Sequence, residues 1–286
     1  MSERTVQLLG FALLALCLLV SELGLQRRSP MQGALRQARL LALLAGYGGL
    51  IGATAWVQNL PYAFAWALPP LAARFLAAAA LAFGLVALRA AWVGVTGHLR
   101  MIAAMLLVYL VPLAATLMLF HLDRIDLASP VAWVFLAIVL AMSLSALLAF
   151  FRLPFDERGL SSGLLGLVGT LAGLWGAALF LWPAAPIPFL FPWPDDPLTT
   201  RLIGAMFLTV ATACHYAEGP SERRSADLLC FVYGAGIALA CAYAAWQGKT
   251  FPWAYLVFWA AVAVVSLKAL LSERGAAPAP GPSRRG

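Results

Sequence analysis

The sequence predicts an all-α, polytopic membrane protein with nine transmembrane helices. Of its 286 residues, 63% are hydrophobic and 11% are charged, with a mean hydropathy of +0.88, whereas a soluble domain has about 25% charged residues. The apolar residues fall into nine runs, each close to the roughly 20 residues with which a helix crosses the hydrocarbon core of a bilayer. The net charge of +7 does not indicate nucleic-acid binding, because the arginines are scattered between apolar runs instead of forming a basic patch.

The first run, Val6–Leu25, is followed directly by Arg27 and Arg28, and no small-residue cleavage pattern comes after it. We therefore expect a retained helix and not a signal peptide. The eight further helices are expected over Leu40–Val57, Leu71–Leu88, Met101–Phe120, Val131–Phe151, Leu164–Trp182, Leu198–Tyr216, Leu228–Trp246 and Trp253–Leu271.

The basic residues predict the orientation of the chain. With the N-terminus outside, 14 of the 19 Lys and Arg residues fall on the cytoplasmic side, where short loops of membrane proteins concentrate positive charge. Only Lys249 and Lys268 are lysines, an Arg bias that indicates a GC-rich bacterial source. We expect a multi-pass protein of the bacterial inner (plasma) membrane, with its N-terminus outside and its C-terminus in the cytoplasm.

One segment occurs twice. Pro61–Arg74 recurs 127 positions later as Pro188–Arg201, with six identical residues that include Phe, Trp, Pro and Arg. The same shift superposes the L-A-G-x-x-G stretch that begins at Leu44 on the one that begins at Leu171. These matches predict an internal duplication.

The duplication predicts one N-terminal helix followed by two four-helix repeats. Because each repeat has an even number of spans, the repeats are expected to be parallel and related by a pseudo-two-fold axis along the membrane normal. The expected units are an N-terminal helix with a basic loop (1–37), repeat A (38–160), repeat B (161–275) and a tail rich in Pro, Gly and Ala (276–286), which is expected to be disordered.

Within the repeated segment, which we call the box, some residues are expected to be structural. Pro70 and Pro197 suit the first turn of a helix, where a backbone N–H is not needed. Asp196 is expected to cap the helix that begins at Pro197. The first copy has Pro69 at the equivalent position and lacks this cap.

The other box residues are the candidate ligand-binding residues, namely Trp66, Arg74, Trp193 and Arg201. Each Arg comes about one turn after a helix start, where a guanidinium, a positive helix end and an aromatic ring can together hold a phosphate or carboxylate. The alternative is interfacial anchoring, because Trp and Arg are common where a membrane helix meets water.

Other residues that could carry chemistry are few. His98 is expected in a cytoplasmic turn, His121 at the outer end of the fourth span and His215 near the inner end of the seventh, a placement that fits neither a haem pair nor a metal site. The four Cys residues include no C-x-x-C pair and are expected to be small core hydrophobes. We therefore expect no cofactor and no metal. No Asp, Glu or Lys lies in the middle of any span, which is atypical of ion-coupled transporters and proton pumps.

Three functions are compatible with these features. The leading hypothesis is a non-enzymatic protein that binds or transports a small amphipathic or lipid-like anionic molecule. The first alternative is an accessory or scaffolding subunit that contacts another membrane protein. The second is an enzyme acting on lipid head groups with His121, Asp123 or the Asp195–Asp196 pair. A cavity open to the outer face beside Arg74 and Arg201 would favour the first of these functions.

Overall fold

The structure, a computed structural model, describes residues 3–58, 60, 66, 68–125, 130–154, 163–184, 190 and 196–275. Across these residues it is all-helical, and nine helices are long and apolar enough to cross a membrane. The helices are α1 (Glu3–Arg28), α2 (Gly33–Val57), α3 (Pro70–Val93), α4 (Thr96–Phe120), α5 (Pro130–Arg152), α6 (Leu164–Leu181), α7 (Pro197–Tyr216), α8 (Pro220–Trp246) and α9 (Trp253–Gly275), with a short 3-10 helix at Leu122–Arg124. The sequence-based prediction of a polytopic, all-α membrane protein is therefore confirmed.

Three helices begin earlier than their apolar runs. α2 starts at Gly33, α4 at Thr96 and α8 at Pro220, so each carries one to two polar turns before its apolar part. One expectation was wrong for this reason. His98 lies in the first turns of α4 and is fully buried, not in a turn between helices. Arg39, which comes directly before the apolar run expected at Leu40, lies inside α2 and is only 1% exposed.

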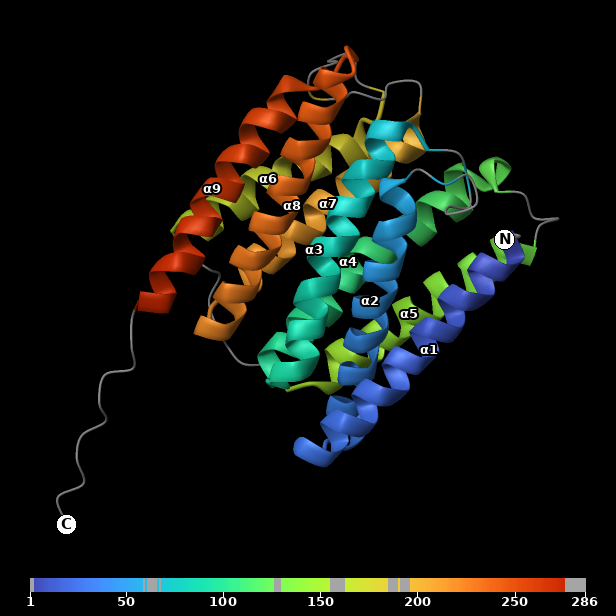
Figure 1. Ribbon diagram of the computed structural model, residues 1–286, viewed down its shortest axis with the longest axis vertical. Coiled ribbons are helices and arrows are strands. Elements are labelled where there is room, and N and C mark those ends of the chain that lie inside the picture. The colour runs from blue at the N-terminus through green and yellow to red at the C-terminus, as the bar shows by residue number, and fades with distance from the viewer. Residues whose placement is uncertain are drawn as a thin grey trace.

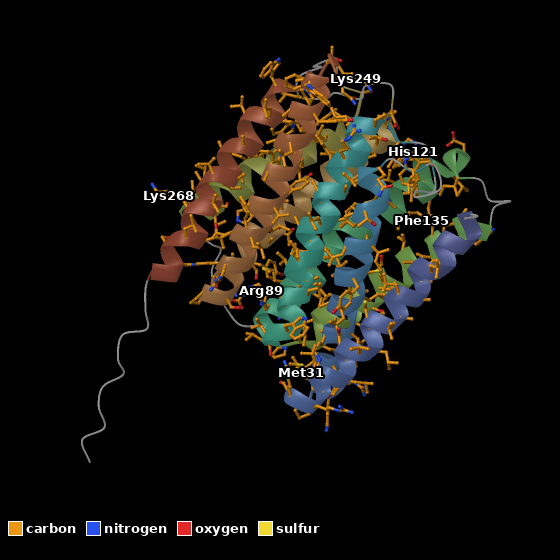
Figure 2. All side chains as sticks on the ribbon, in the orientation of Figure 1. Met31, Arg89, His121, Phe135, Lys249 and Lys268 are labelled. Atoms are coloured by element: carbon orange, nitrogen blue, oxygen red, sulfur yellow. The ribbon has the colours of Figure 1, made fainter. Side chains whose placement is uncertain are left out.

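The bundle has two ends that are used below as reference points. The box end is where α3 and α7 begin, at Pro70 and Pro197, and the far end is where α4 and α8 begin, at Thr96 and Pro220. In Figure 2, His121 and Lys249 are labelled toward the box end, and Arg89 and Met31 toward the far end.

The centre of the bundle is formed by α3, α4, α7 and α8, with α1 and α5 on one side of the view and α6 and α9 on the other (Figure 1). In the most apolar stretch of each helix, 78% of the residues are buried in α7 but only 11% in α1. Aromatic side chains fill the space between α6, α7, α8 and α9. Phe207 packs against Trp259 at a ring distance of 4.9 Å, and Trp259 packs against Tyr233 at 4.8 Å.

Glycines allow two helix pairs to approach closely. A Cβ at Gly49 of α2 would lie 2.7 Å from the carbonyl oxygen of Ala80 in α3. In α6 a Cβ at Gly176 would lie 2.7 Å from the carbonyl oxygen of Gly204 in α7, and a Cβ at Gly204 would lie 2.8 Å from that of Gly176. No larger residue fits at these crossings unless the helices separate, so the glycines determine the spacing of both pairs.

The first helix is attached to the bundle by an ion-pair cluster near the far end. Glu22 of α1 lies 2.9 Å from Arg36 Nε and 3.5 Å from Arg39 Nε. Arg39 also donates to the Ser29 carbonyl oxygen over 2.8 Å. Because α1 otherwise has few buried residues, this cluster is a main tie between α1 and α2.

Candidate functional site

Arg201 lies in the first turns of α7 and interacts with the end of α4. Its Nη1 lies 2.7 Å from His121 Nε2, its Nε donates to the Phe180 carbonyl oxygen over 3.3 Å, and its guanidinium lies 5.0 Å from the centre of the Phe120 ring. Since an arginine always donates, His121 Nε2 is the acceptor and the imidazole is neutral. Within the described residues no carboxylate is in ion-pair range of Arg201, so its charge has no counter-ion there.

Arg74, the equivalent residue of the first box copy, has different surroundings. Its guanidinium lies 4.5 Å from the centre of the Tyr243 ring in α8, and its Nη1 donates to the carbonyl oxygen of Pro70 over a long 3.4 Å. Each box arginine thus packs on the last turns of a different helix, Arg74 on α8 and Arg201 on α4. The structure does not gather the two into one site.

The remaining box residues divide between caps and packing. The Asp196 carboxylate accepts from the backbone N–H of Thr199 over 3.2 Å and so caps α7, whereas Pro69 gives α3 no side-chain cap. Pro70 and Pro197 are the first residues of α3 and α7. Trp66 is half-buried and packs edge-on against Phe135 of α5, with ring centres 6.0 Å apart.

The other box tryptophan, Trp193, lies outside the described residues, as do residues 61–65 and 188–189.

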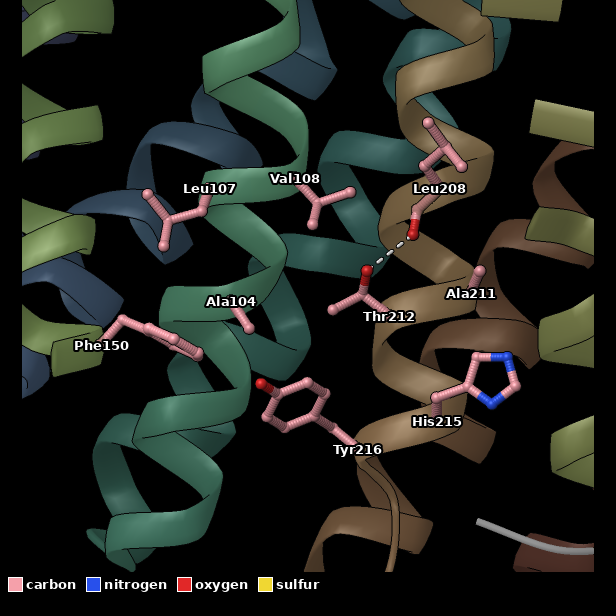
Figure 3. Close-up of a pocket in the computed structure, with 9 residues that line it drawn as sticks. All are labelled: Ala104, Leu107, Val108, Phe150, Leu208, Ala211, Thr212, His215 and Tyr216. Atoms are coloured by element: carbon pink, nitrogen blue, oxygen red, sulfur yellow. Dashed lines mark hydrogen bonds between the residues drawn. The ribbon is translucent and has the colours of Figure 1, made fainter. Parts of the chain in front are cut away.

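A groove of about 480 Å³ lies between α4, α5 and α7 (Figure 3). Val108 of α4 lies on the side of Leu208 of α7, whereas Leu107 lies on the side of α4 where Phe150 is drawn. Thr212 presents little polarity to the groove, because its hydroxyl donates to the carbonyl oxygen of Leu208 in its own helix over 2.8 Å. The walls are therefore almost entirely apolar, and the volume is typical of small-molecule sites.

The groove ends toward the far end of the bundle. Tyr216, the last residue of α7, points toward α4 below Ala104, while the His215 ring points away from these side chains (Figure 3). Phe150 of α5 forms the third side and is held by Arg100, whose guanidinium lies 4.6 Å from the ring centre. A phenol ring and a phenylalanine ring thus close this end.

A second recess, too small for a water molecule and bordered also by Phe180 of α6, lies further along the same two helices toward the box end. Leu113 and Thr116 of α4 lie opposite Leu202 and Ala205 of α7 there, and Arg201 is at its outer limit. The groove and the recess follow one line between α4 and α7, which we call the α4–α7 seam. Sequence reasoning identified Arg201 at one end of this seam but did not identify the groove.

The corresponding contact between α3 and α8 is packed closed. Gly236 of α8 lies against Ala78 of α3 so closely that a Cβ at Gly236 would overlap the Ala78 side chain. At the far end of this contact, Arg89 of α3 donates from Nε to Ser225 Oγ of α8 over 3.1 Å, and Ser225 Oγ lies 2.5 Å from His98 Nε2. Hydrogen bonds and small residues fill the space that is open between α4 and α7.

The described residues contain no group of three or more His, Cys, Asp or Glu that could hold a metal ion. Their four cysteines are free, with Cys214 Sγ 3.5 Å from Cys230 Sγ in the core. A comparison with known protein families, with curated proteins and with solved structures finds no match to this chain.

Proposed function

We propose that this protein binds an anionic, amphipathic, lipid-like molecule along the α4–α7 seam. The observation that carries the proposal is the groove of about 480 Å³, which has apolar walls and lies between the same two helices, α4 and α7, that meet at Arg201. An elongated ligand with an apolar body and one anionic end fits this distribution of polarity. A small polar solute does not, because it would be desolvated against the groove walls without hydrogen bonds in return.

Arg201 supplies the anion-binding end in this proposal. A guanidinium has five N–H donors, and Arg201 uses one on the Phe180 carbonyl oxygen and one on His121. Within the part of the chain that the structure describes, the other three donors have no hydrogen-bond partner. Arg–carboxylate and Arg–phosphate pairs are frequently bidentate and charge-assisted, so a single head group would complete the arginine's interactions.

We also propose that the two halves of the bundle arose by duplication. A Cβ at Gly46 would lie near residue 84, and a Cβ at Gly173 would lie near residue 211. The two glycines are 127 positions apart, and so are residues 84 and 211. A pseudo-two-fold axis would interchange the α3–α8 contact with the α4–α7 contact. On this view the ligand site lies between the halves, and one of two equivalent contacts has closed.

The distribution of basic residues supports the orientation in which the box end faces outward and the C-terminus is cytoplasmic. Of the 19 basic residues, 14 lie on the cytoplasmic side in this arrangement. Binding at a lateral groove between helices is compatible with transport of the ligand between leaflets or with its presentation to a partner.

The proposal is tested by native mass spectrometry of the protein released from lipid nanodiscs. Arg201→Gln removes the guanidinium, and Arg74→Gln is the matched control because Arg74 occupies the same position in the other box copy. We expect the wild type and Arg74→Gln to retain a bound acyl-chain molecule that Arg201→Gln loses. Identical adducts on all three proteins, or none on any, would contradict ligand binding at Arg201.

A further inference from the structure

We infer that the protein binds its anion together with a proton, and that His121 is the residue that takes up the proton. This inference rests on the proposed function and adds a second binding residue and a pH dependence to the same site. It follows from the contact between His121 and Arg201, from the charged groups around them and from the closed space behind Arg201.

The contact between Arg201 and His121 exists in only one protonation state of the imidazole. Arg201 Nη1 lies 2.7 Å from His121 Nε2. Because a guanidinium only donates, Nε2 is unprotonated and the ring proton is on Nδ1. A second proton can therefore enter the ring only at Nε2, the atom that accepts from Arg201. Protonation of His121 removes this hydrogen bond and places two cations next to each other.

An anion at this position changes the balance between the two states. Without an anion, the imidazolium and the guanidinium are like charges in contact and repel each other. A carboxylate or phosphate between the two side chains accepts a charge-assisted hydrogen bond from each. One anion and one proton together leave the net charge of the site unchanged. Binding of the anion therefore favours binding of the proton, and by linkage the proton favours the anion equally.

His121 is the described residue of this site that titrates near neutral pH. The neighbouring elements bring few other charges: α5 and α6 contribute none at this end, and α7 contributes Arg201 and Asp196. The Asp196 carboxylate caps α7. Asp123 and Arg124 follow His121 in the short 3-10 helix, where Asp123 is exposed. Of these groups, only an imidazole ordinarily changes its charge between about pH 5 and pH 8.

The space behind Arg201 is closed, so the anion and the proton reach it from the box end. The recess between α4 and α7 beside Arg201 is too small for a water molecule, and its walls at Thr116 and Leu202 are buried. His121 is half-buried where α4 ends (Figure 2), and the Phe120 ring that packs on the guanidinium is 63% exposed. The accessible side of the pair is therefore the box end of the bundle.

The other half of the chain lacks this arrangement. The residue 127 positions after His121 is Gly248, which has no side chain that could accept from Arg74 or bind a proton. The Arg74 guanidinium instead lies 4.5 Å from the centre of the Tyr243 ring. We therefore expect the pH dependence at the Arg201 copy of the box alone.

The test is equilibrium binding of radiolabelled dihexanoyl phosphatidylglycerol to the full-length protein in phosphatidylcholine nanodiscs. The phosphodiester of this probe keeps one negative charge from about pH 8 to about pH 5.5, the interval in which an imidazole titrates. We expect the wild-type affinity to increase as the pH falls. The increase should reach at most about tenfold per pH unit, the limit for one proton taken up with one anion.

Two substitutions of His121 separate the proton from the rest of the site. His121→Gln keeps an oxygen that can accept from Arg201 but never becomes charged, so its affinity should stay at the wild-type value of the alkaline end. His121→Arg carries a permanent charge, so its affinity should stay at the wild-type value of the acidic end. His215→Gln is the control, because it removes the histidine near the other end of α7 and should keep the wild-type pH dependence.

The inference can fail separately from the proposed function. A pH-independent wild-type affinity, or the wild-type pH dependence in either His121 variant, would overturn the role of His121. Absence of probe binding at every pH would also overturn it, while a lipid adduct lost only from Arg201→Gln in native mass spectrometry would still support the proposed function. If Arg201→Gln binds the probe as the wild type does and keeps the adduct, both are overturned.

Discussion

His98 Nε2 and Ser225 Oγ lie 2.5 Å apart, and the two residues are separated by 127 positions, the interval between the box copies. Under the proposed duplication these would be equivalent residues, and they would meet at the axis that relates the two halves. Ser225 Oγ also accepts from Arg89 Nε over 3.1 Å, and its one hydrogen and two lone pairs accommodate both partners. The far end of the bundle is thus joined by polar contacts between α3, α4 and α8.

Ser225→Ala tests this connection. The change leaves His98 Nε2 without its partner in a fully buried position, and an unsatisfied buried polar group costs about 1–3 kcal/mol. We expect the free energy of unfolding in detergent to fall by that amount. Ser272→Ala is the control, since Ser272 is exposed and bonds only to Ala269 of its own helix. Equal stability of the two variants would show that the contact is not stabilising.

Glu22→Gln should weaken the attachment of α1. It leaves Arg39, which is 1% exposed, without the carboxylate 3.5 Å from its Nε, and breaking a buried ion pair typically costs about 3–5 kcal/mol. We expect a loss near the lower end of that range, measured by denaturant unfolding or by proteolysis of α1.

Arg36→Gln is the matched control, because Arg36 is the other arginine that pairs with Glu22. The Arg36 side chain is 53% exposed, and exposed pairs contribute only about 0–1 kcal/mol. If Arg36→Gln destabilised the protein as much as Glu22→Gln, the buried Arg39 would not be the residue that needs Glu22.

The helices could be predicted closely from apolar runs alone, because the membrane requires each span to be long and apolar. What could not be predicted were the polar first turns of α2, α4 and α8. Residues of those turns are buried against other segments, Arg39 beside Glu22 of α1 and His98 beside Ser225 of α8, and no periodic apolar signal marks contacts between distant segments.

The candidate site was predicted only in part, for a related reason. Arg201 was identifiable because the box is repeated, but its partner His121 is 80 positions away in the chain. The groove depends on how far α4 and α7 stand apart at Ala104 and Ala211. Alanines in a sequence rich in alanine give no sign of which contact is open.

Asp196→Ala should destabilise the start of α7 and, through it, the position of Arg201. The Asp196 carboxylate accepts from the Thr199 backbone N–H over 3.2 Å, and loss of such a cap costs about 0.5–2 kcal/mol. We expect a lower melting temperature and weaker retention of the proposed ligand, measured as a smaller lipid adduct in native mass spectrometry. Asp196→Asn keeps a capping oxygen and should restore both, whereas equal loss in both variants would assign the effect to the charge instead of the cap.

Gly204→Ala should separate α6 from α7. The added Cβ would lie 2.8 Å from the Gly176 carbonyl oxygen and 2.9 Å from the Phe180 backbone N, both backbone atoms that cannot turn aside, and such overpacking typically costs about 1–3 kcal/mol. Gly48→Ala in α2 meets nothing within 4 Å and should be neutral or stabilising by up to about 1 kcal/mol. Because the Phe180 carbonyl oxygen also accepts from Arg201, Gly204→Ala should weaken ligand binding more than its loss of stability alone explains. An unaltered lipid adduct in native mass spectrometry of a destabilised Gly204→Ala protein would mean that α6 does not position Arg201.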